Sequence, residues 1–211
     1  AIITFFRQCI AERRVNPGND LISELLAAEV DGHAVAESDI IGTCVLLLVA
    51  GIDTTWSAIG SSLWHLATHA EDRACLAADP GLMTTAVEEL LRAYAPVTMA
   101  RIVAEDTEVA GCPMRSGDRI LMAFPAANRD PEKFPDADRI LLDRQKNPHI
   151  AFGVGIHRCV GSNLARMEVR VALEEWMARI PDFWVEEPDA VTWAGGQVRG
   201  PRSLPVIFPV R

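Results

Sequence analysis

The stretch AFGVGIHRCVG, residues 151–161, is the most informative part of this 211-residue chain. It places Cys159 just before an amphipathic run, residues 162–180, whose apolar positions recur with helical spacing. Its glycines allow tight turns and let backbone N–H groups approach the sulfur. A cysteine at a helix N-terminus lies at the positive end of the helix dipole, which favours the thiolate. The stretch therefore predicts a thiolate ligand for a soft metal centre, with Phe152 excluding water.

Three other interpretations of this loop are weaker. Gly153 and Gly155 could open a dinucleotide-binding fingerprint, but residue 158 is arginine where the third glycine belongs, and no βαβ unit follows. Cys159 and His157 could form a nucleophile and its base, but two residues apart on a tight loop is poor geometry. A buried structural cysteine stays open, because free cysteines are often buried.

The spacing of the loop resembles the haem-thiolate loop of the cytochromes P450. The residues that carry the resemblance are Phe152, Gly153, Gly155, His157, Cys159 and Gly161. The resemblance implies a non-covalent haem b with the Cys159 thiolate as axial iron ligand. It also implies cofactor contacts from Phe152, Gly153 and Gly161.

Composition excludes several other classes of protein. The chain is 49% hydrophobic and 23% charged, which is enough for a domain with a large core. The formal net charge of −9 argues against a nucleic-acid surface. The five cysteines form no C-x-x-C pair and no C-x-x-C-H motif, so the spacing indicates no zinc site, no disulfide framework and no covalent haem.

Location is inferred from the lack of targeting signals. No signal peptide opens the chain, and the odd number of cysteines fits a reducing compartment. The longest apolar run, residues 44–52, is too short to span a membrane. We therefore expect a soluble, cytoplasmic protein that does not bind a membrane.

Periodicity and turn residues predict a mainly α fold with small β elements. Helices are expected over residues 1–14, 20–29, 37–68, 70–78, 80–94 and 162–180, and strands within 97–124 and 185–210. Residues 128–148 are rich in proline, aspartate and arginine and predict a long ordered loop, called the meander below. In the order of its parts, this pattern is similar to the C-terminal half of the cytochrome P450 fold.

The long predicted helix carries AGIDTT at residues 50–55, where a glycine and two threonines lower helix propensity. A core helix that tolerates small residues is the simpler interpretation. The functional one is a local bulge or kink beside which a small ligand binds. The segment is similar to the family's oxygen-activating stretch, which implies that Thr54 holds dioxygen and its waters, that Asp53 relays protons, and that Ala50 and Gly51 contact the cofactor.

Glu89 and Arg92 form an E-x-x-R pair on the predicted helix 80–94. Such a pair is usually an exposed ion pair of little energetic value. Here the neighbouring residues are apolar, and Glu88 is a competing partner. The pair looks like the family's invariant E-x-x-R helix, which implies a structural network with Arg139 of the meander as third member.

Basic residues are needed for the two haem propionates, which require charge-assisted partners when buried. The resemblance places Arg101, His149 and His157 in this role, although each could instead be an exposed loop residue. Arg158, Arg166 and Arg170 would form a positive patch on the cysteine side of the haem. That patch could dock an acidic electron donor, or it could be a solvated helix face.

The resemblance implies a monooxygenase that inserts one atom of dioxygen into an apolar substrate. Reducing equivalents would come from NAD(P)H through a ferredoxin and its reductase, or through a fused reductase. The expected substrate pocket is lined by Leu46, Val49, Ala50, Val97 and Met99.

Members of the family are about twice as long as this chain. We therefore expect residues 1–211 to be the C-terminal part of a single haem domain whose N-terminal half is absent. The alternatives are a peroxide-using or isomerising haem-thiolate enzyme, and an incomplete, non-catalytic haem-domain fragment.

Overall fold

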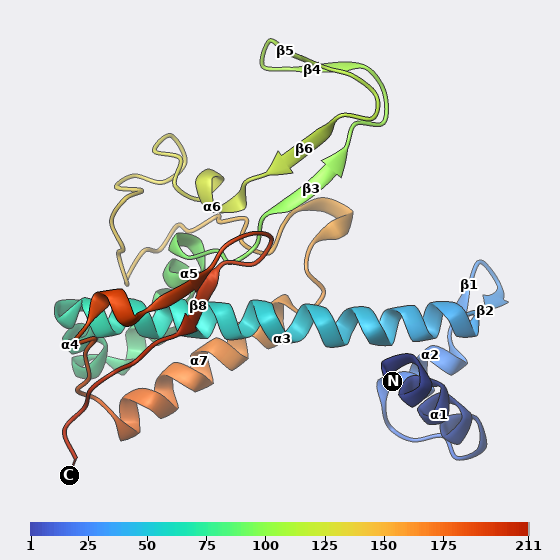
Figure 1. Ribbon diagram of the computed structural model, residues 1–211, viewed down its shortest axis with the longest axis horizontal. Helices are drawn as coiled ribbons and strands as arrows, with labels where there is room; N and C mark the ends of the chain where they lie inside the picture. The colour runs from blue at the N-terminus through green and yellow to red at the C-terminus, as the bar shows by residue number, and fades with distance from the viewer. Residues whose placement is uncertain (211) are drawn as a thin grey trace. The chain divides into compact units, whose positions relative to one another are not determined.

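The computed structural model describes residues 1–210, which form two compact units, residues 1–53 and 54–210. Figure 1 traces the elements in chain order. Helix α3 (Glu37–Thr68) begins in the first unit and ends in the second. The mainly α fold with small strands agrees with the sequence prediction.

The first unit contains two short helices and a very small hairpin. Helices α1 (Ile2–Val15) and α2 (Leu21–Ala27) lie side by side. The Asp20 carboxylate caps α2 by accepting the Ser23 N–H at 3.0 Å, as the sequence predicts. Strands β1 (Glu29–Val30) and β2 (His33–Ala34) pair antiparallel across the turn at residues 31–32. A small core of Ile10, Ile40 and Cys44 closes this unit.

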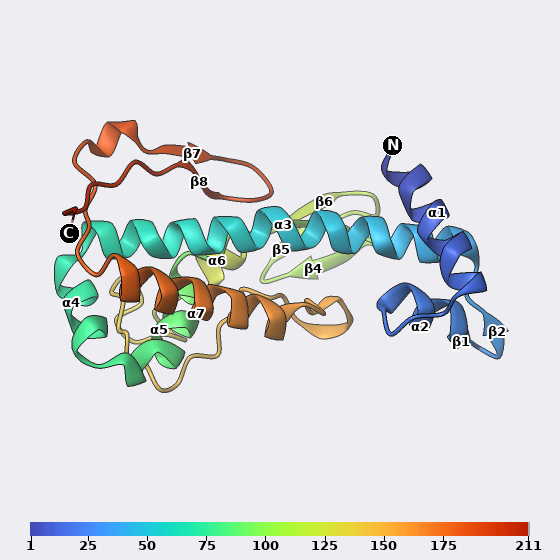
Figure 2. The same cartoon turned by 90° about the horizontal axis from the view of Figure 1, so that it is seen from below.

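The second unit holds the remaining helices. They are α4 (Ala70–Ala78), the 3-10 turn η1 (Pro80–Leu82), α5 (Met83–Ala93), α6 (Phe124–Ala127), the 3-10 turn η2 (Gly155–His157), α7 (Ser162–Arg179) and the 3-10 turn η3 (Pro188–Ala190). Helices α5 and α7 pack on each other (Figure 2). Their shared core also takes in the end of α3, with Leu66, Leu90, Val169 and Leu173 almost completely buried.

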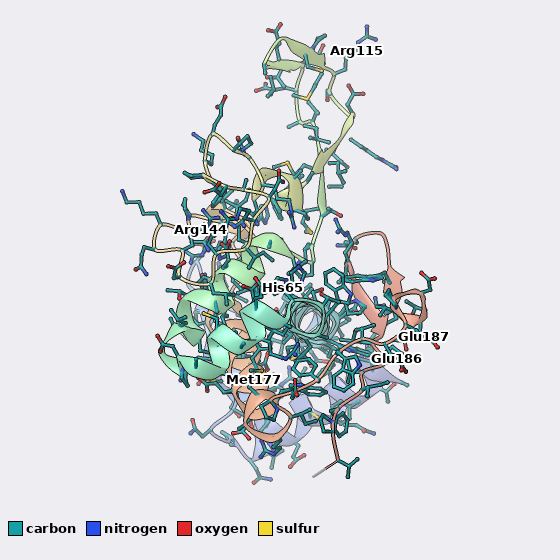
Figure 3. The ribbon with its side chains drawn as sticks, turned by 90° about the vertical axis from the view of Figure 1, so that its left-hand side faces the viewer. His65, Arg115, Arg144, Met177, Glu186 and Glu187 are labelled. Atoms are coloured by element: carbon teal, nitrogen blue, oxygen red, sulfur yellow. The ribbon has the colours of Figure 1, made fainter. Side chains whose placement is uncertain are left out.

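Three two-stranded antiparallel sheets complete the second unit. Strand β3 (Met99–Ile102) pairs with β6 (Arg119–Met122), with Met99 opposite Met122. Strand β4 (Thr107–Val109) pairs with β5 (Cys112–Met114), and β7 (Thr192–Ala194) pairs with β8 (Gly200–Ser203). Figure 3 labels Arg115, which directly follows β5 at the open end of the β4–β5 hairpin.

A close backbone contact holds β8 against α3. A Cβ atom on Gly200 would lie 2.4 Å from the Ser57 Cβ, and one on Gly60 would lie 2.8 Å from the Pro201 Cγ. Both distances are shorter than real Cβ contacts, so only glycine permits this approach. The two glycines therefore allow the terminal hairpin to pack directly on the helix.

Helix α3 also meets a length and composition criterion for crossing a membrane, with a mean hydropathy of 1.6 over an 18-residue window, 22% of which is buried. The uninterrupted apolar run at residues 44–52 is by itself too short to span a membrane, and the 18-residue window extends beyond it. Core helices of soluble proteins satisfy the same criterion, so this observation alone assigns no location.

Candidate functional site

The cysteine loop, residues 151–161, is closed by its own backbone. The Cys159 N–H donates to the Phe152 carbonyl at 2.9 Å, and the Arg158 N–H donates to the Gly155 carbonyl at 3.1 Å. Gly153 and Gly155 have φ angles of 70° and 67°, a left-handed region that favours glycine. The sequence therefore folds here into a tight loop that ends at Gly161, the residue capping α7.

The loop exposes its thiol together with apolar side chains. Cys159 is an exposed free cysteine, and it lies at the start of α7 as predicted. Val154, Ile156 and Val160 are 58%, 97% and 86% exposed. The interpretation of a buried structural cysteine is therefore wrong for Cys159. Apolar side chains around an exposed thiol create a surface that a flat apolar group would cover at a gain in free energy.

The metal-binding side chains of this site fit an iron that is already coordinated by a macrocycle. Within residues 1–210, no group of three or more His, Cys, Asp or Glu side chains could hold a bare metal ion. A single thiolate can complete the coordination of iron in haem, as it does in haem-thiolate proteins. The exposed sulfur and its apolar surroundings therefore fit this cofactor, with Cys159 as the residue that would bind the iron.

Arg101 and His157, two of the residues predicted to bind propionates, are accessible to solvent. Arg101 is in β3 and half-buried, and its Nη1 donates to the Ala100 carbonyl at 2.9 Å. His157 is in η2, two residues before the cysteine, and is exposed. A guanidinium and an imidazole both suit a carboxylate-bearing ligand, and the role of the two residues stays a prediction.

His149 has a different role from the one predicted. Its Nε2 lies 3.0 Å from the Glu88 Oε2, and its Nδ1 accepts the Ala151 N–H at 3.3 Å. The side chain is 2% exposed. Since both ring nitrogens have protein partners, His149 has no nitrogen left for a propionate. The sequence missed this because the Glu88 partner lies 61 residues away.

The E-x-x-R pair is completely buried and fully hydrogen-bonded. Arg92 donates through Nε and Nη2 to the two Glu89 carboxylate oxygens, each at 2.8 Å. Its remaining hydrogen bonds go to the backbone carbonyls of Asn128, Ala137 and Arg139 at 2.8–2.9 Å. Burial acts to raise the pKa of Glu89, but hydrogen bonds from Arg92 and other donors outweigh it and lower this pKa. The pair is therefore a structural network, as predicted.

The third member of the network is Arg144 and not Arg139. Arg144 Nε donates to Glu89 Oε2 at 2.9 Å and is 7% exposed. The Arg139 residue is exposed and contributes only its backbone carbonyl to Arg92. Figure 3 shows Arg144 in the meander. Both arginines lie in the same aperiodic stretch, so the sequence offers no signal that separates them.

A second network, which residue spacing along the chain does not indicate, joins the cysteine loop to α5 and α7. Arg166 of α7 donates to both Glu88 oxygens, with Nη2 3.0 Å from Oε2, and its guanidinium lies over the Phe152 ring at 4.5 Å. Burial acts to raise the pKa of Glu88, but hydrogen bonds from His149 and Arg166 lower it to about 2. The carboxylate is therefore ionised at neutral pH.

This network changes the interpretation of the basic patch. Arg166 is held by Glu88, and Arg170 pairs with Glu174 at 3.0 Å. Arg158 is exposed on the loop. Two of the three predicted patch charges are therefore neutralised by neighbouring carboxylates, which weakens the case for a docking surface.

The predicted oxygen-activating segment is α-helical throughout, so no π-bulge interrupts it. Open space does lie beside Gly51, since a Cβ at that position would meet no atom within 4 Å among the described residues. Asp53 and Thr54 are half-buried, and Ala50 is exposed.

The predicted substrate-pocket residues differ in exposure. Leu46 and Val49 are 66% and 62% exposed in the first unit. Val97 and Met99 are half-buried in the second unit, where Val97 forms an isolated β-bridge with Val198. Their shared role in a pocket stays a prediction.

Comparison with known proteins agrees with this geometry. Residues 81–180 match the sequence model described as "Cytochrome P450". The chain is 40% identical over 200 residues to "Probable cytochrome P450 127A1" of Sinorhizobium fredii, covering 95% of the chain and 48% of that protein. It is 36% identical over 210 residues to the "Steroid C26-monooxygenase" of Mycolicibacterium smegmatis, covering 99% and 52%.

Solved structures give the same result. The Bacillus subtilis cytochrome P450 PksS superposes with a TM-score of 0.93 at 38% identity, covering 98% of this chain and 54% of that one. CYP109E1 of Bacillus megaterium, solved with testosterone, gives a TM-score of 0.92 at 34% identity, covering 98% and 58%.

The cysteine loop, the buried Glu89–Arg92 network and the order of helices define a protein of the haem-thiolate class. The chain belongs to the cytochrome P450 family. It spans about half the length of the curated relatives it matches.

Proposed function

We propose that this chain provides the thiolate side and the proton-delivery residues of a haem-dependent monooxygenase. The observation that carries the proposal is the exposed Cys159 thiol in an apolar glycine loop at the start of α7. Relatives named as a steroid C26-monooxygenase and a mycinamicin IV hydroxylase/epoxidase support the same reaction class.

The cofactor in this proposal is haem b, held without a covalent bond by the residues of the cysteine loop. When bound through a thiolate, it supplies the reductive activation of dioxygen. Cys159 binds the iron, and the glycine loop keeps its backbone N–H groups close to the sulfur. Arg101 and His157 pair with the propionates. Phe152 limits the access of water to the sulfur.

Thr54 and Asp53 handle protons in the proposed reaction. A threonine hydroxyl can donate and accept hydrogen bonds, so Thr54 orders the water that delivers a proton to dioxygen. Asp53, the residue before it, exchanges protons with solvent through its carboxylate. Both are half-buried on α3, where a side chain can contact both solvent and a ligand.

The proposed substrate is an apolar organic molecule, because Leu46, Val49, Val97 and Met99 are all apolar. Reducing equivalents come from NAD(P)H through a ferredoxin and ferredoxin reductase or a fused reductase. We place the enzyme in the cytoplasm, with α3 as a core helix and not a membrane span. The whole protein would include a further, N-terminal part of the haem domain, in keeping with relatives of about twice this length.

The test uses the haem-loaded protein that contains this chain. Cys159→Ser should abolish the red-shifted band of the reduced, CO-treated protein, because serine provides no thiolate. Cys75→Ser and Cys112→Ser are matched controls, since both cysteines are also exposed, and they should keep the band. A Cys159→Ser protein that keeps the band would show that another residue binds the iron.

The proton-delivery role has a separate test. Thr54→Ala should leave consumption of reduced nicotinamide largely intact while hydrogen peroxide replaces product. The ratio of product to nicotinamide consumed measures this uncoupling. An unchanged ratio would exclude the role. Asp53→Asn should slow turnover and keep a normal haem spectrum.

A further inference from the structure

We infer that Arg166 is a positioning residue for the cysteine loop, which it holds in place by clamping the Phe152 ring and the Glu88 carboxylate. The inference rests on the proposed function of Cys159 as the iron ligand. It concerns the network described above, in which His149 and Arg166 both contact the Phe152 ring and both bind Glu88 of α5.

The first side of the clamp is the guanidinium of Arg166. Its Nε and Nη2 donate to the two oxygens of Glu88, and its Cζ lies 4.5 Å from the centroid of the Phe152 ring. Only a planar group with several parallel donors can bind a carboxylate with two nitrogens and stack on a ring at the same time. Arg166 is 28% exposed, so solvent screens these contacts only in part.

The second side is His149. Its ring centroid lies 6.1 Å from that of Phe152, and its Nε2 contacts the same Glu88 carboxylate at 3.0 Å. Its Nδ1 accepts the Ala151 N–H, which fixes the backbone at the start of the loop. Glu88 thus joins two groups that both contact the Phe152 ring.

The clamp reaches the sulfur-bearing residue through one hydrogen bond. The Phe152 carbonyl accepts the Cys159 N–H at 2.9 Å. Arg166 Nη1 also lies 3.4 Å from the Ser162 carbonyl, in the first turn of α7. The guanidinium therefore connects both ends of the loop, and its loss should free the Cys159 backbone without removing the sulfur.

The chain offers a matched control on the same helix. Arg170 lies one turn after Arg166 and pairs with Glu174 at 3.0 Å. Its side chain is 54% exposed, and Glu174 lies on α7 itself. Arg170→Met therefore removes the same charge and the same kind of side chain from α7 while leaving the Phe152–Glu88 clamp intact.

The first experiment measures ligation in the haem-loaded protein that contains this chain. In Arg166→Met, the share of the reduced CO adduct with the red-shifted thiolate band should fall on mild warming, with the ratio of thiolate to other forms lower by about fivefold, as expected from the loss of one stacked cation. Arg166→Lys should recover part of this loss, because lysine keeps the charge but has no planar fork. Arg170→Met should match the wild type.

The second experiment needs no haem. It follows exchange of the Cys159 amide hydrogen in the haem-free protein by peptide mass spectrometry, because this N–H donates to the Phe152 carbonyl that the clamp holds. Arg166→Met and Glu88→Gln should each accelerate this exchange by about fivefold relative to the wild type, whereas Arg170→Met should not. This measurement stays decisive if Arg166→Met folds poorly, because Glu88→Gln and Arg166→Lys test the same clamp.

The outcomes separate the two proposals. If Cys159→Ser keeps the thiolate band, the iron ligand has been assigned wrongly, whatever Arg166 does. If Cys159→Ser loses the band but Arg166→Met and Glu88→Gln behave like Arg170→Met in both measurements, the positioning role of Arg166 is overturned. Full recovery by Arg166→Lys would also overturn it, since charge alone would then suffice.

Discussion

The buried E-x-x-R network and the cysteine loop lie in the same unit. They differ in burial and in whether their functional groups have partners within the chain. Glu89 and Arg92 are fully buried, and each charge has several partners within the chain. The cysteine loop instead exposes its thiol together with Val154, Ile156 and Val160. The charges of the first region are paired within the chain, whereas the second region presents a surface that another group can cover.

The difference separates residues that maintain the fold from residues that perform chemistry. A buried ion pair must be complete, because an unpaired buried charge is strongly destabilising. A binding loop has the opposite requirement, since its functional atom must stay accessible. We therefore expect substitutions in the network to change the free energy of unfolding, and substitutions in the loop to change ligand binding.

The largest expected effect is that of Glu89→Ala. It leaves Arg92 buried and without its carboxylate, at a cost of about 3–5 kcal/mol in the free energy of unfolding. This is comparable with the whole stability of a typical domain, so little soluble, haem-loaded protein should be recovered. Denaturant unfolding measures the change, and a soluble variant of normal stability would remove the distinction between the two regions.

The next effect distinguishes the two arginines of the meander. Arg144→Met should cost about 1–3 kcal/mol in unfolding free energy, because it removes a charge-assisted hydrogen bond to Glu89. Arg139→Met is the matched control and should stay within about 0.5 kcal/mol, since only the backbone carbonyl of Arg139 contacts Arg92. Equal losses from the two variants would contradict the assignment of Arg144.

A smaller effect should appear in the pH dependence of stability. The pKa of Glu88 is lowered from 4.5 to about 2, so the folded state favours its ionised form. The contribution is complete above pH 4.5 and is lost as the pH falls from about 4.5 towards 2. After allowance for solvent around this pair, we expect about 1–2 kcal/mol. Unfolding of Glu88→Gln should depend less on pH over this range than that of the wild type, and identical slopes would exclude the effect.

The smallest effect on stability is expected in the loop. Ile156 is 97% exposed, so Ile156→Ser should change the unfolding free energy of the haem-free protein by no more than about 0.5 kcal/mol. Leu173→Ala, in the buried core, should cost about 2–5 kcal/mol by comparison. A large loss from Ile156→Ser would mean that the loop is part of the folded core.

Much of the fold could be predicted from the sequence because its helices have strong local signals. The Asp20 cap and the spacing of apolar residues in 70–78 and 162–180 located α2, α4 and α7 to within two residues at each end. Cys159 was placed correctly before α7 since the glycines and the following periodic run are both local features.

The partners of buried charges could not be predicted in the same way. Arg139 and Arg144 lie in a stretch without periodicity, and which of them reaches Glu89 depends on the path of the meander in space. His149 and Arg166 meet at Glu88 from 61 and 78 residues away. Contacts of this range depend on tertiary packing, which residue spacing along the chain does not contain.

The Glu89–Arg92 network also has a consequence for the order of folding. Its bonds to the meander join residues 36 to 58 positions apart, from Asn128 to Asn147. Closing loops of that length is entropically costly before any contact forms. Helix α5 brings Glu89 and Arg92 together locally, so it can form first and present both charges as a template. The meander, which has no regular structure of its own, then acquires its path late, and its ordering should limit the rate at which the second unit folds.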